Sequence, residues 1–464
     1  MNLALSLLYA AERTPHADAL VGETTRLTYA QLCERAGRIA SGLASRGVQR
    51  GDRVACVLAN DPETVELYWG CQWLGAVVVP LSHRISESDL EYCIGDCGAD
   101  VVIRDSSEVR ELAAADEHAG ALDLDECEAS IQLYTSGTTG RPKGVPRSHG
   151  ADRAGGISQV LQHGLHPGHR TLGVMPLYHT MGIHSLIAAS VVGGCFVAQP
   201  SWDPEQALGL IERERINTLY LAPTLFYDLV HHPRLGDFDT SSVRAVAYAG
   251  SPMASALVER VAEALEPEIF VNHYGSTEIY TFSVQRAQQA KPGCAGRAAL
   301  NARLRLDPPG EGEILCNMSS DEAFARYWNR PDADEKAIRD GWYHTGDIGR
   351  IDEDGDLWVV GRVDDMVISG GENIHPVEIE DVLAGAPGVG EVAVVGAPDE
   401  RWGQRVVAYV VVAEGDVTAD ELDAFCLGAE TLARFKRPRE YRFVSELPKS
   451  PSGKILRRML RDET

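Results

Sequence analysis

Two patterns along the chain predict an α/β protein with a change of architecture near its C-terminal end. Between residues 27 and 102, helical and strand-like hydrophobic periods alternate, which is typical of parallel sheets flanked by helices. From Asp364 onward the pattern changes to an acidic helix that begins at Pro376, two strands and a basic C-terminal stretch. The length of 464 residues allows about three compact lobes. We therefore expect a boundary at residues 362–365.

Local signals predict the elements of the first region in order. Thr28 begins a helix, and Ser86 followed by Asp89 resembles a capping box at the start of a later helix. Between and after these helix starts, the apolar patterns predict a strand at 53–58, a helix at 62–75 and a strand at 99–103. A polar, acidic segment at 104–128 then leads to a new unit.

Two later strands end in glycine-containing turns. The strand at 243–248 leads to Gly250 and Ser251 before a helix at 254–265, and the strand at 269–273 leads to the turn at 274–278. In open α/β sheets, ligands bind beyond the carboxyl ends of the strands. Both turns are therefore candidate binding elements.

Charge and cysteine usage exclude several classes of function. The formal net charge is -25, from 43 Lys+Arg and 68 Asp+Glu, which disfavours nucleic acid and anionic membranes as partners. Residues 1–11 lack the basic start of a secretory signal, and the apolar stretch at 186–198 is too short to span a bilayer. The ten cysteines form no CxxC pair and are expected to be core residues. We expect a soluble, cytoplasmic protein.

The loop at 133–144 has the composition of a phosphate cradle. Four hydroxyl residues, three glycines and Lys143 lie within ten positions, so backbone N–H, hydroxyl and ammonium groups can all approach one anion. The spacing is neither that of a P-loop nor that of a Rossmann fingerprint. The alternative interpretation is a flexible Ser/Thr/Gly linker.

This loop resembles the signature of the adenylate-forming superfamily of acyl- and aryl-CoA ligases, luciferases and peptide-synthetase adenylation domains. Further motifs follow in the family's order, at residues 274–278, 341–347, 361–365 and 451–454. The segments at 368–376, 401–404 and 435–438 look most like the 4-chlorobenzoate-CoA ligase group. The resemblance implies an ATP- and acid-binding domain at 1–362, built of parallel-rich sheets and a β-subdomain. It also implies a small, mobile α+β lid at 363–464.

The resemblance assigns roles in the activation of a carboxylic acid by ATP. Lys454 would bridge the carboxylate and the α-phosphate, Glu278 would bind Mg²⁺, and Thr277 would contact the α-phosphate. Tyr274 would stack on adenine, and Asp347 would bind the ribose hydroxyls. The complete ATP-binding set implied is Thr135, Ser136, Gly137, Thr138, Thr139, Gly140, Lys143, Gly250, Ser251, Tyr274, Gly275, Ser276, Asp347 and Arg362.

The same resemblance implies a second half-reaction with CoA. Asp364 matches the family's hinge, about which the lid would exchange Lys454 for Gly371 in the site. The proposed CoA contacts are Gly371, Trp402, Phe435, Arg437 and Arg84. Nine basic residues at 434–458 form the one basic patch of an acidic chain and suit the phosphates of CoA. The alternative is an ordinary solvated face.

The family match also suggests an acid pocket. His179, in a Met-Pro-Leu-Tyr-His segment, would border or gate this pocket and act in catalysis. The complete set suggested is His179, Thr180, Met181, Tyr220, His273, Gly275, Tyr280 and Thr281. Because several of these side chains can form hydrogen bonds, we expect an aromatic acid with hydroxyl or amino substituents. The aspartate that holds an α-amino group in amino-acid-activating relatives is absent, and no zinc motif is present.

The leading hypothesis is an AMP-forming aryl-CoA ligase that uses ATP, Mg²⁺ and CoA. Alternatives are transfer of the acyl group to a carrier-protein thiol or an amine, a medium-chain acyl-CoA synthetase, and a degenerate nucleotide sensor. No nucleic acid or membrane partner is expected, and the chain would be a monomer or a homodimer.

Overall fold

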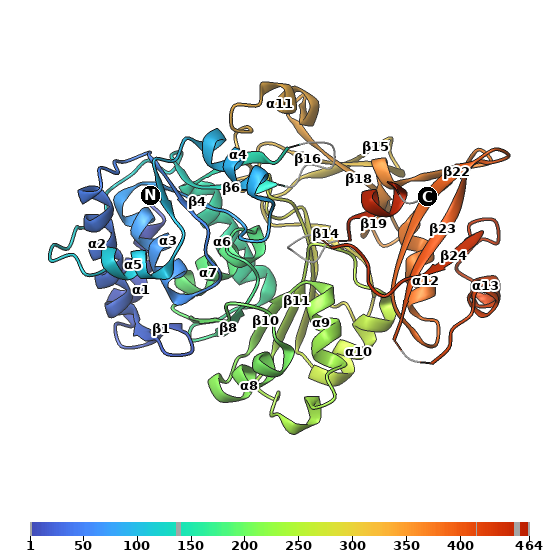
Figure 1. The fold of residues 1–464 in the computed structure, drawn as a ribbon, viewed down its shortest axis with the longest axis horizontal. Coiled ribbons are helices and arrows are strands. Elements are labelled where there is room, and N and C mark those ends of the chain that lie inside the picture. Colours follow the sequence, from blue (N-terminus) through green and yellow to red (C-terminus); the bar gives the residue numbers. More distant parts are fainter. Residues whose placement is uncertain (1, 136–140, 414, 450–454, 463–464) are drawn as a thin grey trace.

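The fold is known from a computed structural model, which describes residues 2–135, 141–413, 415–449 and 455–462. The first helices lie at one end of an elongated molecule and the C-terminal strands at the other (Figure 1). Four sheets are formed by the described residues. The alternation that predicted a mixed α/β protein is confirmed.

The first sheet has five strands in the order β5-β3-β4-β6-β7, with four strands parallel and β7 antiparallel to β6. Its strands are β3 (Arg53–Cys56), β4 (Val77–Pro80), β5 (Val101–Ile103), β6 (Ala129–Thr135) and β7 (Lys143–Ser148). The helices of this region are α1 (Ala4–Arg13), α2 (Tyr29–Ser45), α3 (Pro62–Leu74), α4 (Glu87–Cys97) and α5 (Ser106–Leu112).

The predicted helix starts are confirmed, and one predicted linker is wrong. A capping box of Thr28 and Gln31 begins α2, and the side chain of Ser86 accepts a hydrogen bond from the Asp89 N–H at the start of α4. The segment at 104–128 contains α5, because Val109 and Leu112 are buried in the core. The chain then returns to the same sheet through β6 rather than starting a new unit.

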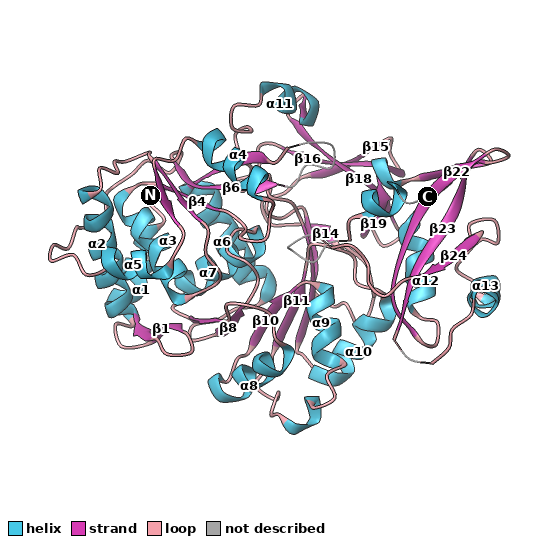
Figure 2. Ribbon diagram, viewed as in Figure 1, coloured by secondary structure: helices cyan, strands magenta, loops and turns pink. Residues whose placement is uncertain are grey.

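The second sheet has nine strands in the order β14-β13-β12-β11-β10-β8-β9-β1-β2, and its centre is parallel. Helices α8, α9 and α10 lie beside β10 and β11 (Figure 2). The strands are β1 (Asp18–Val21), β2 (Arg26–Thr28), β8 (Arg170–Gly173), β9 (Cys195–Ala198), β10 (Thr218–Leu221), β11 (Ala245–Tyr248), β12 (Ile269–Tyr274), β13 (Ser283–Gln285) and β14 (Arg297–Ala298). The helices are α6 (His149–His163), α7 (Thr180–Val192), α8 (Pro204–Glu214), α9 (Pro223–Val230), the 3₁₀ turn η1 (Leu235–Asp237) and α10 (Ser255–Leu265).

The third sheet is antiparallel and forms a β-subdomain. Its elements are β15 (Leu304–Asp307), β16 (Glu311–Asn317), α11 (Pro331–Ala337), β17 (Ile338–Arg339), β18 (Trp342–Ile351) and β19 (Leu357–Arg362). Strand β19 ends at the residue where the first domain was predicted to end, and the next strand belongs to another sheet.

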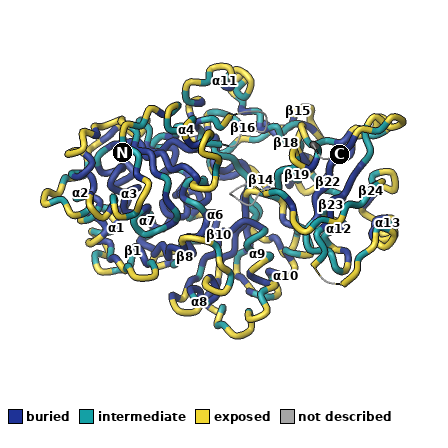
Figure 3. Tube along the Cα trace, in the orientation of Figure 1, coloured by how far each residue is buried: buried dark blue, intermediate teal, exposed yellow. Residues whose placement is uncertain are grey.

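The C-terminal part combines a five-stranded sheet with helices, as the α+β prediction requires. Its own buried clusters form around β22 and β23 (Figure 3). The elements are η2 (Val363–Asp365), β20 (Val367–Ser369), β21 (Glu372–Ile374), α12 (Pro376–Ala384), β22 (Val389–Asp399), β23 (Gly403–Val412), α13 (Ala419–Gly428), β24 (Glu440–Phe443) and α14 (Arg457–Asp462). The mobility of this part stays a prediction.

The cysteines behave as predicted, since nine of the ten are buried, Cys127 is exposed, and all are free thiols. Among the described residues, no helix combines the length and the apolar composition needed to cross a membrane.

Candidate active site

The phosphate-loop motif joins two antiparallel strands at the edge of the first sheet. Thr135 ends β6 opposite Lys143, the first residue of β7. Ser136, Gly137, Thr138, Thr139 and Gly140 lie outside the described residues. The Thr135 hydroxyl is buried and has no hydrogen-bond partner among the described residues. A hydroxyl in this state can contact a ligand oxygen.

Lys143 is partly buried, and its Nζ lies 4.2 Å from the centroid of the Tyr327 ring. Burial lowers the pKa of this ammonium, while the charge of Glu278 acts in the opposite direction. The lysine therefore stands near a carboxylate without forming an ion pair with it in the described structure. Its charge remains available for a phosphate.

The turn at 274–278 is held close to the sheet by its own backbone. A Cβ at Gly275 would lie 1.8 Å from the Tyr280 carbonyl oxygen, so only glycine fits there. The Ser276 hydroxyl accepts hydrogen bonds from the N–H groups of Glu278 (3.2 Å) and Ile279 (3.3 Å). These contacts fix the direction in which Thr277 and Glu278 leave the strand.

Glu278 provides a carboxylate of the kind that binds Mg²⁺. It is 6% exposed, and its Oε1 accepts a hydrogen bond of 2.7 Å from the Tyr327 hydroxyl. No hydrogen bond from the described residues reaches its second oxygen. A hard oxygen ligand beside a phosphate-loop lysine fits Mg²⁺, which prefers one or two carboxylates together with substrate phosphates.

Three residues of the predicted ATP-binding set contact one another. Asp347 on β18 lies opposite Arg362 on β19, and their side chains are 3.3 Å apart (Nη1 to Oδ1). The Tyr274 hydroxyl donates to Asp347 Oδ2 at 2.6 Å. Burial and the Asp347 charge raise the pKa of Tyr274. This triad joins the second and third sheets at one point.

Gly250 and Ser251 lie at the same edge as this triad. They follow β11, which is parallel to β12 and adjacent to it, so the two turns leave the sheet side by side. Gly250 has a φ of +89°, a left-handed conformation that glycine adopts without strain. Both predicted turns therefore flank one site.

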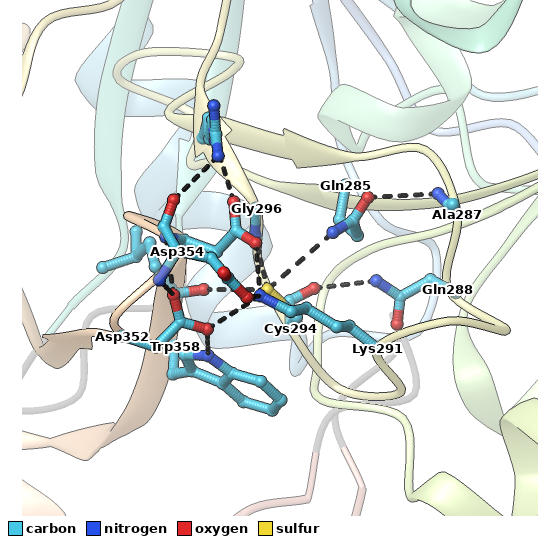
Figure 4. Close-up of polar contacts among 12 residues, drawn as sticks. Gln285, Ala287, Gln288, Lys291, Cys294, Gly296, Asp352, Asp354 and Trp358 are labelled. Carbon is cyan, nitrogen blue, oxygen red and sulfur yellow. Dashed lines mark hydrogen bonds and ion pairs between the residues drawn. The ribbon is translucent and has the colours of Figure 1, made fainter.

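Three carboxylates, those of Asp352, Asp354 and Asp356, form a cluster at the turn between β18 and β19, and the Lys291 ammonium lies at its centre (Figure 4). The Lys291 Nζ donates to Asp352 (3.0 Å), Asp354 (2.6 Å) and Asp356 (2.7 Å). Lys291, together with Arg297, which pairs with Asp356 at 2.9 Å, offsets part of the negative charge of these three carboxylates. These contacts of Lys291 connect the loop before β14 to the β18–β19 hairpin that carries Asp347.

His179 and Thr180, two residues of the predicted acid pocket, lie at the start of α7. His179 accepts a hydrogen bond on Nδ1 from the Met181 N–H (3.3 Å) and so caps α7. The Thr180 hydroxyl donates to the Thr277 hydroxyl at 3.3 Å. One residue of the predicted acid pocket is therefore in direct contact with the turn at 274–278.

His273 is less available for a substrate hydrogen bond than its sequence position suggested. Its Nε2 lies 3.3 Å from the Tyr280 carbonyl oxygen, and its Nδ1 lies 3.0 Å from Nε2 of His163. A carbonyl oxygen only accepts, so His273 Nε2 carries the hydrogen and Nδ1 accepts from His163. Burial lowers the pKa of His273 to about 4 and also lowers the pKa of His163, so both rings are neutral. Because both of its nitrogens are hydrogen-bonded within the protein, His273 can contact a ligand only through the face or the carbon edge of its ring.

Four more residues of the predicted acid pocket are buried. The Tyr280 hydroxyl donates to Gln159 Oε1 at 2.8 Å, and its ring stacks on His184 with centroids 3.5 Å apart. The Tyr220 ring lies 5.5 Å from that of His273, centroid to centroid. Met181 and Thr281 are 3% and 1% exposed.

Sequence reasoning missed Arg147 and Tyr327. The buried Arg147 forms an ion pair with Asp152 (2.6 Å) and donates to the carbonyl oxygens of Thr277 (2.9 Å) and Glu322 (3.2 Å). An arginine inside a strand four residues after Lys143 was the only available signal, and the two carbonyl groups that it binds are far away in sequence. Tyr327 carried no local signal.

The proposed CoA contacts are spread over both parts of the chain. Trp402 and Phe435 are 43% and 45% exposed. Gly371 has a φ of +86° in the turn between β20 and β21, and Trp402 packs against its neighbour Gly370. Arg84 is exposed between β4 and α4, and Asp364 is exposed in η2. Lys454 lies outside the described residues.

Several residues of the basic patch at 434–458 form ion pairs with acidic side chains. Lys436 pairs with Glu378 at 2.6 Å, and Arg437 pairs with Asp423 at 2.8 Å. Three more of its members also form ion pairs, namely Arg442 with Glu440, Lys449 with Glu391 and Arg457 with Glu380. Five of the described basic residues of this patch therefore form ion pairs with acidic side chains, and its role in CoA binding stays a prediction.

A profile described as "AMP-binding enzyme" matches residues 7–328, and one described as "AMP-binding enzyme C-terminal domain" matches residues 378–454. The chain belongs to the AMP-binding enzyme family. The adenylate-forming family that its motifs indicated is thus confirmed.

Curated relatives match nearly the whole chain. A feruloyl-CoA synthase of Amycolatopsis sp is 36% identical over 96% of both chains. A 4-chlorobenzoate–CoA ligase of Arthrobacter sp is 34% identical over 100% of this chain and 95% of its own. The fatty acid–[acyl-carrier-protein] ligase ScoC of Streptomyces coeruleorubidus is 33% identical over 99% and 96%. These relatives are named as ligases of aromatic or of fatty acids, and the acceptor is CoA in some names and an acyl-carrier protein in another. They support the prediction that this chain is an acid–thiol ligase.

A solved structure supports the fold. The o-succinylbenzoate coenzyme A synthetase of Bacillus subtilis, in complex with ATP and magnesium ion, is 30% identical with a TM-score of 0.87. The similarity covers 98% of this chain and 99% of that one. The large α/β part and the smaller C-terminal part are thus those of adenylate-forming enzymes.

Proposed function

We propose that this ligase activates an aromatic carboxylic acid with ATP and transfers the acyl group to CoA. A carboxylate oxygen attacks the α-phosphorus, the bond to the β-phosphate breaks, and pyrophosphate leaves. The CoA sulfur then attacks the acyl carbon, and AMP leaves with the oxygen that joined them. The observation that carries the proposal is that two groups of residues meet at the turn at 274–278. Tyr274 contacts Asp347, which pairs with Arg362, and Glu278 of the same turn lies near Lys143.

In the first half-reaction two anions must meet, so cationic groups are needed where charge accumulates. Lys143 and Lys454 would supply that charge on the protein side, and the Thr277 hydroxyl would contact the α-phosphate. Glu278 would hold Mg²⁺, which neutralises phosphate charge when bound. Asp347 would accept hydrogen bonds from the ribose hydroxyls, with Tyr274 against the adenine.

The remaining members of the ATP set would surround the nucleotide. The backbone N–H and hydroxyl groups of residues 135–140 would bind the pyrophosphate side. Gly250, Ser251, Gly275 and Ser276 would pass against the base, since their turns leave adjacent strands. Arg362 would reach the ribose or a phosphate.

In the second half-reaction the C-terminal part would rotate about Asp364. Gly371 would then replace Lys454, and the pantetheine arm would enter beside Trp402 and Phe435. Arg437 and Arg84 would bind CoA phosphates. Arg437 would exchange its Asp423 partner for a phosphate, and a bidentate arginine suits either.

The acid would lie among His179, Thr180, Met181, Tyr220, His273, Gly275, Tyr280 and Thr281. Ring faces of His273 and Tyr220 favour a planar substrate. Tyr280 already donates to Gln159, so its hydroxyl oxygen would accept from a substrate hydroxyl or amino group.

The test is acid-dependent pyrophosphate release across hydroxylated, aminated, halogenated and unsubstituted aromatic acids and medium-chain fatty acids, with and without CoA. We expect release with aromatic acids, the highest kcat/KM for those with hydroxyl or amino groups, and AMP release stimulated by CoA. A higher kcat/KM for medium-chain fatty acids contradicts the aromatic assignment.

A carrier-protein thiol is the second candidate acceptor. The internal ion pairs of Lys436 and Arg437 reduce the positive charge offered to CoA phosphates, which favours this alternative. Pyrophosphate release without stimulation of AMP release by CoA would support it.

A further inference from the structure

Tyr327 lies between the two charged groups that flank the phosphate site. It is 3% exposed and lies a few residues before α11. Its hydroxyl donates to Glu278 Oε1 at 2.7 Å, and the Lys143 ammonium lies 4.2 Å from its ring centroid. One side chain thus contacts both the phosphate-loop strand and the catalytic turn.

The tyrosine is itself held in place. Its N–H donates to Asp334 Oδ1 at 2.8 Å, and its ring packs edge-on against Phe324 with centroids 4.9 Å apart. Phe324 in turn donates its N–H to the Glu278 carbonyl oxygen at 2.7 Å. The backbone and the carboxylate of Glu278 are therefore fixed by the same short segment.

The placement of Tyr327 affects how Lys143 and Glu278 interact. A lysine and a glutamate at the edge of a dry site attract each other strongly, and a direct ion pair would occupy both. The ring provides Lys143 with a neutral cation–π partner, and the hydroxyl binds a single oxygen of Glu278. No ion pair joins Lys143 to Glu278 in the described part of the chain, so each charge is left for a ligand.

We propose that Tyr327 is a positioning residue for adenylation, which keeps Glu278 oriented toward Mg²⁺ and Lys143 toward the ATP phosphates. The proposal rests on the proposed function. Hydrogen-bond partners of metal ligands commonly change metal affinity by about 10–100-fold when removed. Tyr327 would act in this way on Glu278, and separately through its ring on Lys143.

Two substitutions separate these actions. Tyr327→Phe removes only the hydroxyl, and Tyr327→Leu removes the ring as well. Tyr29→Phe is the matched control, because Tyr29 is also buried and its hydroxyl donates to the Gly194 carbonyl oxygen at 2.7 Å, outside the proposed site. Thermal unfolding of each variant compares their stabilities.

The first measurement is equilibrium binding of Mn²⁺ in the presence of ATP, followed by electron paramagnetic resonance. The second is the Mg²⁺ dependence of pyrophosphate exchange. For Tyr327→Phe we expect metal affinity to fall about 10-fold, with kcat at saturating Mg²⁺ within about twofold of the wild type. Tyr327→Leu should also raise KM for ATP. Thioester formation from supplied acyl-adenylate should not change in either variant.

A Tyr327→Phe protein that binds Mn²⁺ with ATP as tightly as Tyr29→Phe, or more tightly, overturns the proposal. So does equal slowing of both half-reactions, which indicates a merely structural role. Absence of acid-dependent pyrophosphate exchange in the wild type refutes the proposed function instead, and the metal-binding comparison still tests Tyr327.

Discussion

Acidification from pH 7.5 to 5.5 is expected to lower the free energy of unfolding through buried histidines. His149, His169 and His273 are at most 2% exposed, and burial lowers the pKa of each to about 4. His163 and His184 shift in the same direction for the same reason. All five are held as neutral rings.

The sign follows from comparing the folded and unfolded states. A histidine with a depressed pKa in the folded protein is protonated first in the unfolded chain, so its stability contribution is present above about pH 6.5 and is lost as the pH falls toward 4. Between pH 7.5 and 5.5, one histidine with pKa values of about 6.5 unfolded and about 4 folded costs about 1.3 kcal/mol. Three such residues give about 4 kcal/mol.

The assay is chemical unfolding at both pH values, followed by fluorescence of the buried Trp69 and Trp73. His169→Asn removes one titrating group and should reduce the pH-dependent loss by about 1.3 kcal/mol relative to the wild type. Carboxyls whose pKa burial raises, such as Glu66, act in the opposite direction, so the comparison between variants isolates the histidine.

The control is His16→Asn, because His16 is exposed. Its loss over the same pH interval should equal that of the wild type. If His169→Asn and the wild type lose the same free energy, the assignment of acid sensitivity to the buried imidazoles is refuted.

Three further substitutions test the proposed chemistry and the domain arrangement. Lys454→Ala should abolish pyrophosphate exchange while sparing thioester formation from supplied acyl-adenylate, and persistence of exchange would contradict its role. Asp347→Asn should raise KM for ATP about 10-fold, because hydrogen bonds to a charged group contribute about 1.5–3 kcal/mol; an unchanged ATP titration contradicts this. Asp381 on α12 accepts from the Ser255 N–H (3.0 Å) and so caps α10, which lacks a cap of its own. In small-angle X-ray scattering, Asp381→Ala should give the profile of a more extended molecule. A profile identical to that of the wild type would show that the contact with Ser255 does not hold α12 against α10.

The fold was predictable where local signals and core packing agree. Thr28 and Ser86 begin helices because their hydroxyls cap them, and the strands before Gly250 and Gly275 ended as expected. The segment at 104–128 was misread because α5 is short and polar outside Val109 and Leu112. Its helical state depends on burial of those two residues, which no local pattern reveals.

The site was predictable where function is carried by contiguous motifs. Tyr274, Asp347 and Arg362 come from three motifs and contact one another in the structure, while their roles toward ATP stay predictions. Arg147 and Tyr327 could not be found in this way, because their importance lies in contacts across 130 and 49 residues of sequence. Lys436 and Arg437 of the basic patch likewise pair with Glu378 and Asp423, which lie outside the stretch and could not be matched to them from the sequence.

The acid pocket shows how much discrimination the proposed function can provide. Both nitrogens of His273 are engaged within the protein, and the Tyr280 hydroxyl has already donated its hydrogen. A site built to bind a substrate hydroxyl rejects the analogue without it by about 10⁴-fold, because its own polar groups would be left unpaired. The hydroxyls of Tyr220 and Thr281 in the same set are buried and have no hydrogen-bond partner among the described residues. An unsubstituted ring would leave these two hydroxyls without a partner, so we expect kcat/KM to favour hydroxylated or aminated aromatic acids over the unsubstituted acid by more than about 200-fold, the range of shape-based selection. A smaller preference would show that these two hydroxyls do not bind the acid.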